Sequence, residues 1–318
     1  MDKHTTDIYL DIDYSLGNTI LSASDINNLG AIFEEYKMPN IPSLWGLDKI
    51  HTNSLDEELF IGNSIREYFY NNDKNKINTI DHVILCGSIT LSFDIISRTV
   101  LKKFREFGVK SCTNMMFISQ LDCTNFMVAV DLARKLVFSG SRRILIVGAE
   151  SGFVNKQRIC NYAAFSDFVG IISVSNEPDG KFLLHDSESY VSFDDIGKEN
   201  IDSYDAANEE NFKNFLENEN IKPDTVGKIY PLNLYVPLLS VKYRKIGFSD
   251  SQIYTDSVAR RGHCWGMDPF ISLSENNFED KPQSALSAEK RLLLLNSQAS
   301  GRSVITSITR NFSTQQID

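Results

Sequence analysis

Residues 115–152, MMFISQLDCTNFMVAVDLARKLVFSGSRRILIVGAESG, constrain the fold more than any other part of the chain. The apolar run at residues 116–121 predicts a strand. From residue 125 onward, apolar side chains recur every three or four positions, which predicts a helix; they are Phe126, Val130, Ala133 and Val137. A second apolar run at residues 143–149 predicts a buried strand of the kind found in parallel sheets. Cys123 is therefore expected where a strand ends and a helix begins.

That position gives Cys123 two interpretations. The unpaired amides and the dipole at a helix N-terminus favour negative charge, so we expect the pKa of the thiol to be lowered. A thiolate at this place is a candidate nucleophile toward thioesters and other acyl groups. A free cysteine is, however, more often a small buried core residue. Position alone leaves both interpretations open.

Composition excludes several classes of function. The chain has 318 residues and a net charge of −10, which argues against a general nucleic-acid binder and, more weakly, against a protein that binds anionic membranes. The five cysteines form no CxxC pair and no metal-binding spacing. The N-terminal residues lack the apolar core of a signal peptide, and no apolar run is long enough to span a bilayer. These features predict a cytoplasmic protein with reduced thiols and no metal site.

The second half of the chain repeats the order of elements in the first. We expect the two halves to be residues 1–175 and 176–318, with a turn at residues 176–180 between them. We also expect a strand at residues 252–258 and a Gly-containing turn at residues 260–266, equivalent to the turn at Cys123. Because equivalent helix ends of a duplicated fold can meet at the axis, His263 is expected near Cys123. Three pairs of strands are predicted to correspond: 81–90 with 225–232, 143–149 with 291–296, and 168–175 with 303–310.

Four segments follow one another in the order and spacing of a known family: LDCTNFMVAVDLARKLVFSG, RRILIVGAES, FSDFVGIISV and LLLLNSQASGRSVITSITRN. Over residues 81–310 the chain resembles β-ketoacyl-acyl carrier protein synthase III and its relatives in the thiolase superfamily. The resemblance implies a thiolase-like α/β fold, with two duplicated βαβ halves in five layers, α-β-α-β-α. It also implies that Cys123 carries the acyl group as a thioester. The amide of Cys123 and a second amide from the Gly-rich turn that contains Ser300 and Gly301 would then bind the oxyanion.

The chain departs from the family at two positions. Tyr230 stands where the synthases have their catalytic His, whereas Asn233, at the end of the same segment, matches. His263 falls at the position of the catalytic Asn. The resemblance therefore predicts Cys123, His263 and Asn233 as catalytic residues, with His263 as a general base near neutral pH. Asp268 either orients His263 or caps the following helix, and the sequence leaves these alternatives open.

The predicted substrate-binding residues are Tyr230, Trp265, Phe165, Ser300 and Gly301, although aromatic residues are more often simply packed in the core. No metal or redox cofactor is expected. Coenzyme A or a phosphopantetheine arm would arrive as part of the substrate. The basic residues Arg260, Arg261, Lys242 and Arg244 either receive its phosphates or form a solvated surface.

Three functions compete. The first is an acyltransferase that takes an acyl group from coenzyme A or an acyl carrier protein, and the second is a decarboxylative condensing enzyme. The third is a non-catalytic partner subunit of a heteromeric ketosynthase. Retention of Cys123 and His263 favours an acyl-transferring or condensing enzyme of specialised, polyketide- or fatty-acid-related metabolism. The resemblance also implies a homodimer, or a heterodimer with a related subunit, formed through the strand at residues 116–121.

Overall fold

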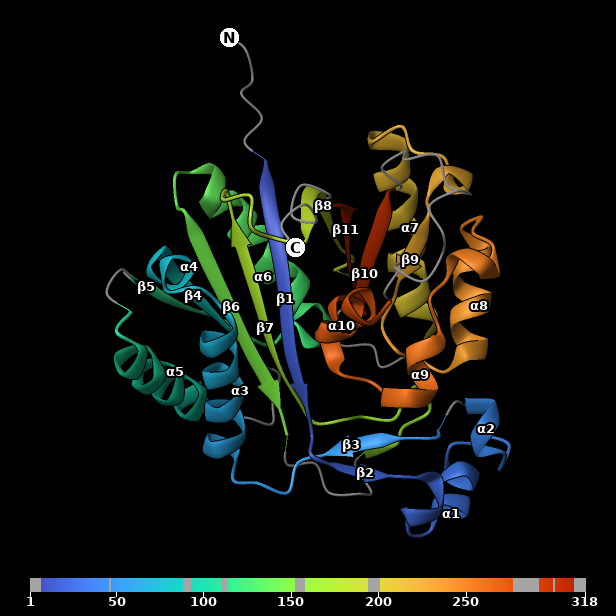
Figure 1. Ribbon diagram of the computed structural model, residues 1–318. Coiled ribbons are helices and arrows are strands. Elements are labelled where there is room, and N and C mark those ends of the chain that lie inside the picture. The colour runs from blue at the N-terminus through green and yellow to red at the C-terminus, as the bar shows by residue number, and fades with distance from the viewer. Residues whose placement is uncertain are drawn as a thin grey trace, which may run out of the picture.

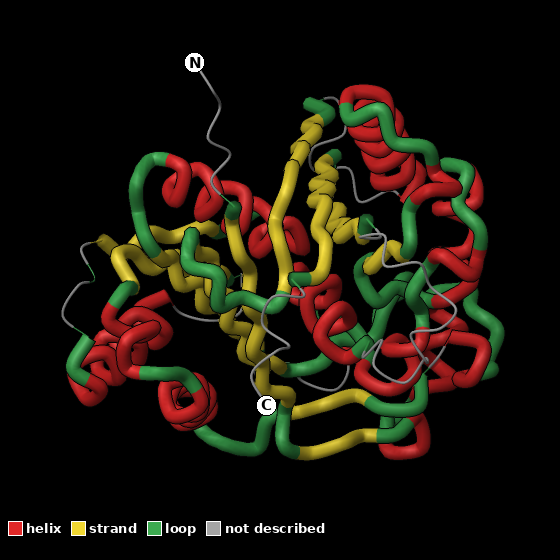
Figure 2. The backbone as a smooth tube through the Cα atoms, turned by 45° about the horizontal axis from the view of Figure 1, so that its top comes forward, coloured by secondary structure: helices red, strands yellow, loops and turns green. Residues whose placement is uncertain are grey.

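The computed structural model describes residues 7–45, 47–87, 93–109, 112, 114–151, 158–193, 201–276, 292–299 and 301–311 (Figures 1 and 2). Within these residues the main sheet has nine strands in the order β5-β4-β6-β7-β1-β8-β11-β10-β9. A separate pair, β2 (Thr19–Leu21) and β3 (Ile50–Thr52), lies beside it. The nine strands are β1 (Ile8–Leu16), β4 (Ile80–Cys86), β5 (Asn114–Ile118), β6 (Arg143–Glu150), β7 (Phe168–Ser175), β8 (Phe182–Val191), β9 (Lys228–Tyr230), β10 (Leu293–Ala299) and β11 (Arg302–Arg310).

The sheet consists of two halves with the same topology. In the first half β1 is antiparallel to β7 and β7 to β6, whereas β6, β4 and β5 are parallel. In the second half β8 is antiparallel to β11 and β11 to β10, whereas β10 and β9 are parallel. Antiparallel pairing of β1 with β8 joins the halves. The strand correspondences predicted from the sequence, β4 with β9, β6 with β10 and β7 with β11, are therefore present.

The helices make the remaining layers, because the buried strands alternate between two apolar faces. One face of the first half packs against α3 (Glu57–Asn71) and α5 (Phe93–Phe107). The other faces of both halves share one core with α6 (Asn125–Phe138) and α10 (Asp268–Glu275). The outer face of the second half packs against α7 (Ile201–Asn218) and α8 (Val236–Lys245). The predicted order of layers, α-β-α-β-α, is confirmed.

One predicted element of the second half is wrong. Residues 252–258 do not form a strand: they contain the end of η5 (Asp250–Gln252), a single bridge between Ile229 and Ile253, and the start of α9 (Asp256–Arg261). That bridge is parallel and lies where the first half has β5. The second half therefore has a single bridged pair of residues in place of the strand equivalent to β5. The division into residues 1–175 and 176–318 stays a prediction.

The N-terminal excursion between β1 and α3 forms its own small core. It contains η1 (Ala23–Asp25), α1 (Leu29–Glu35), α2 (Pro42–Trp45) and the pair β2 and β3. Apolar side chains of this excursion pack against Ile159, Ala164 and Tyr235. The excursion therefore supports, from below in Figure 1, the segment at residues 158–166 that carries part of the site.

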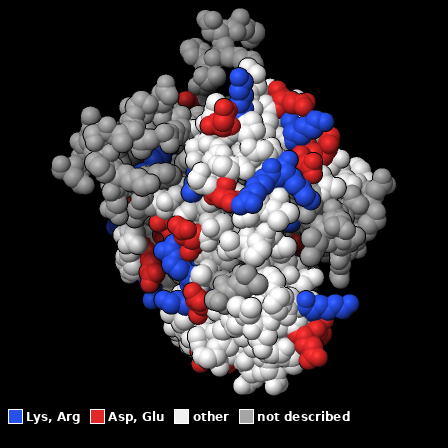
Figure 3. All heavy atoms as spheres, turned by 90° about the vertical axis from the view of Figure 1, so that its right-hand side faces the viewer, with Lys and Arg blue, Asp and Glu red and all other residues white. Residues whose placement is uncertain are grey.

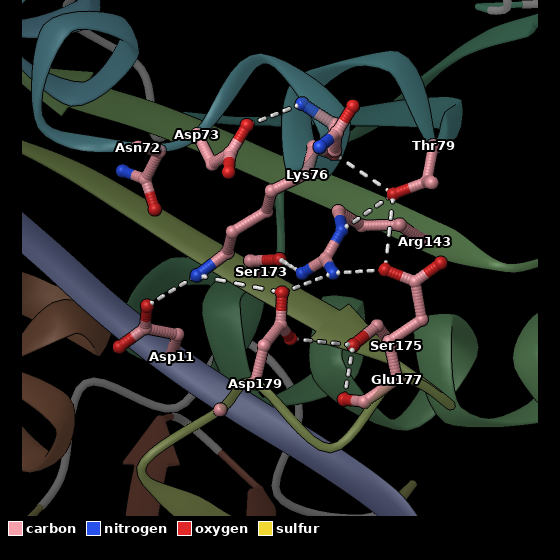
Figure 4. Close-up of polar contacts among 12 residues, drawn as sticks. Asp11, Asn72, Asp73, Lys76, Thr79, Arg143, Ser173, Ser175, Glu177 and Asp179 are labelled. Atoms are coloured by element: carbon pink, nitrogen blue, oxygen red, sulfur yellow. Dashed lines mark hydrogen bonds and ion pairs between the residues drawn. The ribbon is translucent and has the colours of Figure 1, made fainter. Parts of the chain in front are cut away.

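A partly buried ionic network holds together the end of the first half that lies away from Cys123 (Figure 4). Arg143, at the start of β6, is 1% exposed and contacts Glu177 at 2.8 Å. Its guanidinium also pairs with Asp179 at 2.6 Å, and Lys76 of α4 (Lys74–Asn78) contacts Asp11 at 2.8 Å. These residues lie at the ends of the strands away from Cys123, so the network supports the scaffold and not the site. Among the described residues no helix is both long and apolar enough to cross a membrane.

Candidate active site

Cys123 lies in η2 (Asp122–Thr124), a single helical turn between β5 and α6. The turn is tight, because Gln120 and Asp122 both have positive φ angles, of 60° and 48°. The side chain of Cys123 is only 8% exposed, and its carbonyl oxygen accepts a hydrogen bond from the Ser297 hydroxyl of β10. Strand, turn and helix thus hold the thiol at the carboxyl ends of the parallel strands.

The second half builds the same turn in η6 (Trp265–Met267), just before α10. Trp265 has a φ of 48°, equal to that of Asp122. In the first half the amide of Leu121 donates to Oδ1 of Asn125 at 3.1 Å, and in the second the amide of Cys264 donates to Oδ1 of Asp268 at 2.8 Å. Asn125 and Asp268 are therefore equivalent residues, and the duplication places an amide in one half where the other has a carboxylate.

The two turns touch at Gly266, which is equivalent to Cys123. A Cβ atom at Gly266 would overlap the carbonyl oxygen of Cys123, so only glycine permits this approach. This contact brings Cys123 and His263, which are 140 residues apart in the sequence, into one cluster.

His263 reaches the thiol from the second turn. Its Nε2 atom lies 3.4 Å from Sγ of Cys123, and its Nδ1 atom contacts Oδ2 of Asp268. Because an ionised carboxylate only accepts hydrogen bonds, Nδ1 carries the proton and Nε2 is left to accept the thiol proton. The backbone of His263 is fixed too, since its amide donates to Ala164 O at 2.7 Å and its carbonyl accepts from the Ser166 amide at 2.9 Å.

Asp268 is fully buried, yet each of its carboxylate oxygens accepts two hydrogen bonds. Oδ1 accepts from Cys264 N and from Arg261 Nη1 at 2.7 Å, and Oδ2 accepts from Asn233 N at 2.8 Å as well as from His263. Burial opposes ionisation, but interactions with His263 and Arg261 outweigh it and hold the pKa of Asp268 below its ordinary value. Of the two roles left open for Asp268, the structure shows the one that orients His263.

The expected pKa of Cys123 is wrong in direction. Burial raises the pKa of this thiol well above its ordinary value, and the negative charges of Asp122 and Asp268 raise it further. The helix N-terminus was expected to lower it, but the turn also removes the thiol from water. A standing thiolate is therefore disfavoured, and Nε2 of His263 is a nitrogen placed to accept the thiol proton.

Two aromatic residues form a wall around the imidazole. The Phe165 ring lies 5.2 Å from that of His263 and stacks on Trp265, with centroids 4.9 Å apart. The Trp265 ring is nearly parallel to His263, at 6.1 Å and 28°. The structure thus brings Phe165 and Trp265 to the cluster, while their contact with a substrate stays a prediction.

Tyr230 and Asn233 are placed differently from their expected roles. The Tyr230 ring packs against Tyr254 in the central core, and its hydroxyl accepts from Asn276 at 2.8 Å. The side chain of Asn233 donates to Gly262 O at 2.6 Å and accepts from Ser257 at 2.8 Å, so both of its ends are used by the protein. Asn233 reaches Asp268 only through its backbone amide. Its direct contact with the reacting atoms, expected from the sequence, is not seen because its side chain braces the loop behind His263.

The Gly-rich turn is described only in part. Gly301 has a φ of 65°, and its carbonyl accepts from the Ser192 amide at 2.7 Å. Ser300 lies outside the described residues. The second amide of the oxyanion site therefore stays a prediction.

The candidate phosphate-binding residues are mostly engaged elsewhere. Arg261 is 1% exposed and pairs with Asp268, which corrects its assignment to the surface. On the face that lies to the right in Figure 1, basic and acidic side chains are interspersed (Figure 3). Arg244 pairs with Asp250. No group of three or more His, Cys, Asp or Glu side chains within the described ranges is arranged to hold a metal ion.

Comparisons with known proteins agree with this architecture. No family model matches the chain. Over 114 residues it is 31% identical to β-ketoacyl-[acyl-carrier-protein] synthase III of Campylobacter fetus subsp. fetus (strain 82-40), a match that spans 35% of this chain and 33% of that protein. The chain resembles β-ketoacyl-acyl carrier protein synthase III and has the thiolase-like fold. The aligned segment is thus about a third of the length of this curated relative.

Solved structures match over nearly the whole chain. The acyltransferase ChlB3 superposes with a TM-score of 0.74 at 14% identity, covering 96% of this chain and 98% of that one. A Cys-to-Ser variant of Xanthomonas campestris OleA, with bound lauric acid and lauroyl-CoA, gives 0.74 at 11% identity, covering 95% and 99%. The 3-oxoacyl-[acyl-carrier-protein] synthase III of Aquifex aeolicus VF5 gives 0.69 at 17% identity, covering 95% and 99%. At these identities the matches establish the fold alone.

Proposed function

We propose that the protein transfers an acyl group from a coenzyme A or carrier-protein thioester to Cys123 and then to an acceptor. The observation that carries this proposal is the chain of contacts from Sγ of Cys123 through the His263 ring to Asp268. A nucleophile within reach of a base, with that base oriented by a third group, is the arrangement that activates a poor nucleophile.

In the acylation half-reaction the Cys123 thiol gives its proton to Nε2 of His263. The sulfur attacks the thioester carbonyl, the bond from the carbonyl carbon to the donor sulfur breaks, and the imidazolium returns the proton to the leaving thiolate. In the second half-reaction an acceptor O–H or N–H gives its proton to Nε2 while its heteroatom attacks the Cys123 thioester. The Cys123 sulfur leaves and takes the proton back. Asp268 stabilises the imidazolium in both steps.

The site favours a heteroatom acceptor over decarboxylative condensation. Decarboxylation forms an enolate, which needs two hydrogen-bond donors at its oxygen. Tyr230 replaces the expected His and is directed to Asn276, whereas the side-chain amide of Asn233 is directed to Gly262. Neither of these two side chains, therefore, is directed at the thiol beside His263, and a single base suits proton removal from an alcohol or an amine.

The matched proteins support the proposed donor. OleA was captured with lauroyl-CoA and ChlB3 is an acyltransferase, which supports an acyl-CoA or acyl-carrier donor here. We place the reaction in specialised, polyketide- or fatty-acid-related metabolism, because the site departs from that of the fatty-acid synthases at Tyr230 and His263. No resident cofactor is proposed.

Intact-mass analysis after incubation with a panel of acyl-CoA and acyl-carrier thioesters tests this function. We expect one acyl adduct on the wild type, none on Cys123→Ala, and an unchanged adduct on Cys160→Ala, whose thiol packs in the same core cluster. Adding malonyl-carrier protein then separates condensation from simple transfer. Absence of an adduct with every donor, from folded protein, would refute the proposal and favour a partner subunit of a heteromeric ketosynthase.

A further inference from the structure

Arg261 is a buried cation directly behind the candidate catalytic residues. It ends α9 and is 1% exposed, so it is among the largest fully buried side chains of the described residues. An arginine is rarely buried without partners, since removing its charge from water is costly. The groups that contact its guanidinium therefore indicate its role.

The guanidinium spans the first two turns of α10. Nη1 donates to Oδ1 of Asp268 at 2.7 Å and Nη2 donates to the Ser272 hydroxyl at 2.9 Å, while Nε lies 3.5 Å from Oε1 of Glu275. The carbonyl of Arg261 accepts from the hydroxyl of Ser166. These contacts hold the planar fork in one orientation, so its charge acts on Asp268 from a constant distance.

The duplicated half shows what Arg261 adds. Asn125, equivalent to Asp268, has its Oδ1 on the Leu121 amide and its Nδ2 on Gly87 O at 2.8 Å, and these bonds complete a neutral turn. A carboxylate at the same place carries a charge that the turn itself does not need. The charged pair of Asp268 with Arg261 thus belongs to the half that carries His263, and it is not required to build the turn.

We propose that Arg261 is a positioning residue that keeps Asp268 ionised and sets the pH at which His263 can take the proton of Cys123. This inference deepens the proposed acyl transfer and rests on it. The guanidinium contacts of Arg261 given above do not reach Sγ of Cys123 or the ring of His263. Arg261 therefore acts through Asp268.

The sign of the effect follows from electrostatics. A positive charge near a cluster lowers the affinity of every member for protons, so its removal raises the pH at which the thiol becomes reactive. Other ionisable groups also face the cluster and stay in place in the variants below. They are Asp122 of η2, Glu150 of β6, Tyr14 of β1, Glu275 of α10, and Cys160, Tyr254 and Cys264.

The test is the rate at which iodoacetamide alkylates Cys123, measured against pH by mass analysis of the peptide that contains Cys123. In Arg261→Gln, which keeps a donor and loses the charge, we expect the midpoint of the profile to rise by about one pH unit. Below the midpoint that shift corresponds to a roughly tenfold slower reaction. Arg261→Lys keeps the charge but not the fork, and its midpoint should stay near that of the wild type at a lower maximal rate.

Arg244→Met is the matched control, because Arg244 is an exposed arginine that also pairs with an aspartate. It should leave the profile unchanged. A midpoint in folded Arg261→Gln equal to that of the wild type would overturn the inference, since a purely structural role lowers stability without moving a pH profile. If the midpoint rises but no donor acylates the wild type, the role of Arg261 stands and the acyl-transfer proposal fails.

Discussion

At the scale of single residues, the proposed reactivity of Cys123 depends on a proton transfer and not on a standing thiolate. Burial raises the pKa of the thiol, so the sulfur is neutral until a base accepts its proton. His263 lies 3.4 Å away and presents the nitrogen that can accept it, because Asp268 holds the proton on the other one. In the proposed acyl transfer, each of the three residues therefore depends on its neighbour.

Replacing Asp268 by Asn tests this dependence. Asn keeps the size of the side chain but loses the charge that stabilises the imidazolium, so we expect acylation of Cys123 to slow about a hundredfold or more. The measurement is the single-turnover rate of adduct formation by mass spectrometry.

Asp256→Asn is the control for this substitution, since Asp256 begins α9 at the surface. Stability gives a second readout. The pKa of Asp268 is lower in the folded than in the unfolded state, so its contribution is present above the unfolded value and is lost as the pH falls. Asp268→Asn should weaken this acid dependence. A near-wild-type acylation rate in the variant would refute the role of Asp268.

At the scale of elements, the site exists because two equivalent turns meet. η2 and η6 each begin a buried helix, and α6 and α10 lie in one shared core. The Cys123 carbonyl faces Gly266 on one side and accepts from Ser297 on the other. The distance between thiol and imidazole is therefore a property of the contact between the two turns.

Gly266→Ala should separate the turns. The added methyl group overlaps the Cys123 carbonyl oxygen, so the turns must shift apart, at a cost of about 1–3 kcal/mol in the free energy of unfolding. We expect acylation to fall more than tenfold, because small displacements of reacting groups have large effects on rate. Urea unfolding and the adduct rate measure both effects.

Gly30→Ala is the comparison, because the nearest atom to its added Cβ is the end of the Asn40 side chain, at 3.3 Å, which can move. It should change neither quantity appreciably. If Gly266→Ala keeps both its stability and its rate, the contact does not position the thiol.

At the scale of the whole molecule, the sheet ends in β5, the strand that leads to Cys123. β5 is the last strand on its side in the described sheet order, and its Phe117 is 51% exposed. An edge strand with exposed apolar side chains is a template for pairing with another chain. We propose that a second copy, or a related subunit, pairs here.

Phe117→Lys should convert this dimer to monomer, because a charge at a two-fold strand contact is repeated on both partners. Light scattering after size-exclusion chromatography measures the mass. Phe138→Lys is the control: Phe138 ends α6, is 53% exposed, and contacts Arg134, whose guanidinium donates to His185 O of β8 rather than to β5. A monomeric wild type, or a Phe117→Lys variant that stays dimeric, would contradict the proposal.

Local pattern by itself determined the duplicated order of strands and helices and the position of Cys123 between a strand and a helix. Both follow from hydrophobic periodicity and from short-range order along the chain, which depend little on distant residues. The proximity of His263 also followed, because the duplication predicts that equivalent helix ends meet.

Tertiary structure alone decided the partners of each polar side chain. Whether Asp268 caps a helix or orients His263, whether Arg261 is buried, and where Tyr230 and Asn233 point depend on side chains far away in sequence. The pKa of Cys123 was expected in the wrong direction for the same reason: the helix terminus is visible in the sequence, whereas the removal of the thiol from water results from packing of the two halves. Burial and charge partners are properties of the folded molecule, so they appear only when the two turns are in contact.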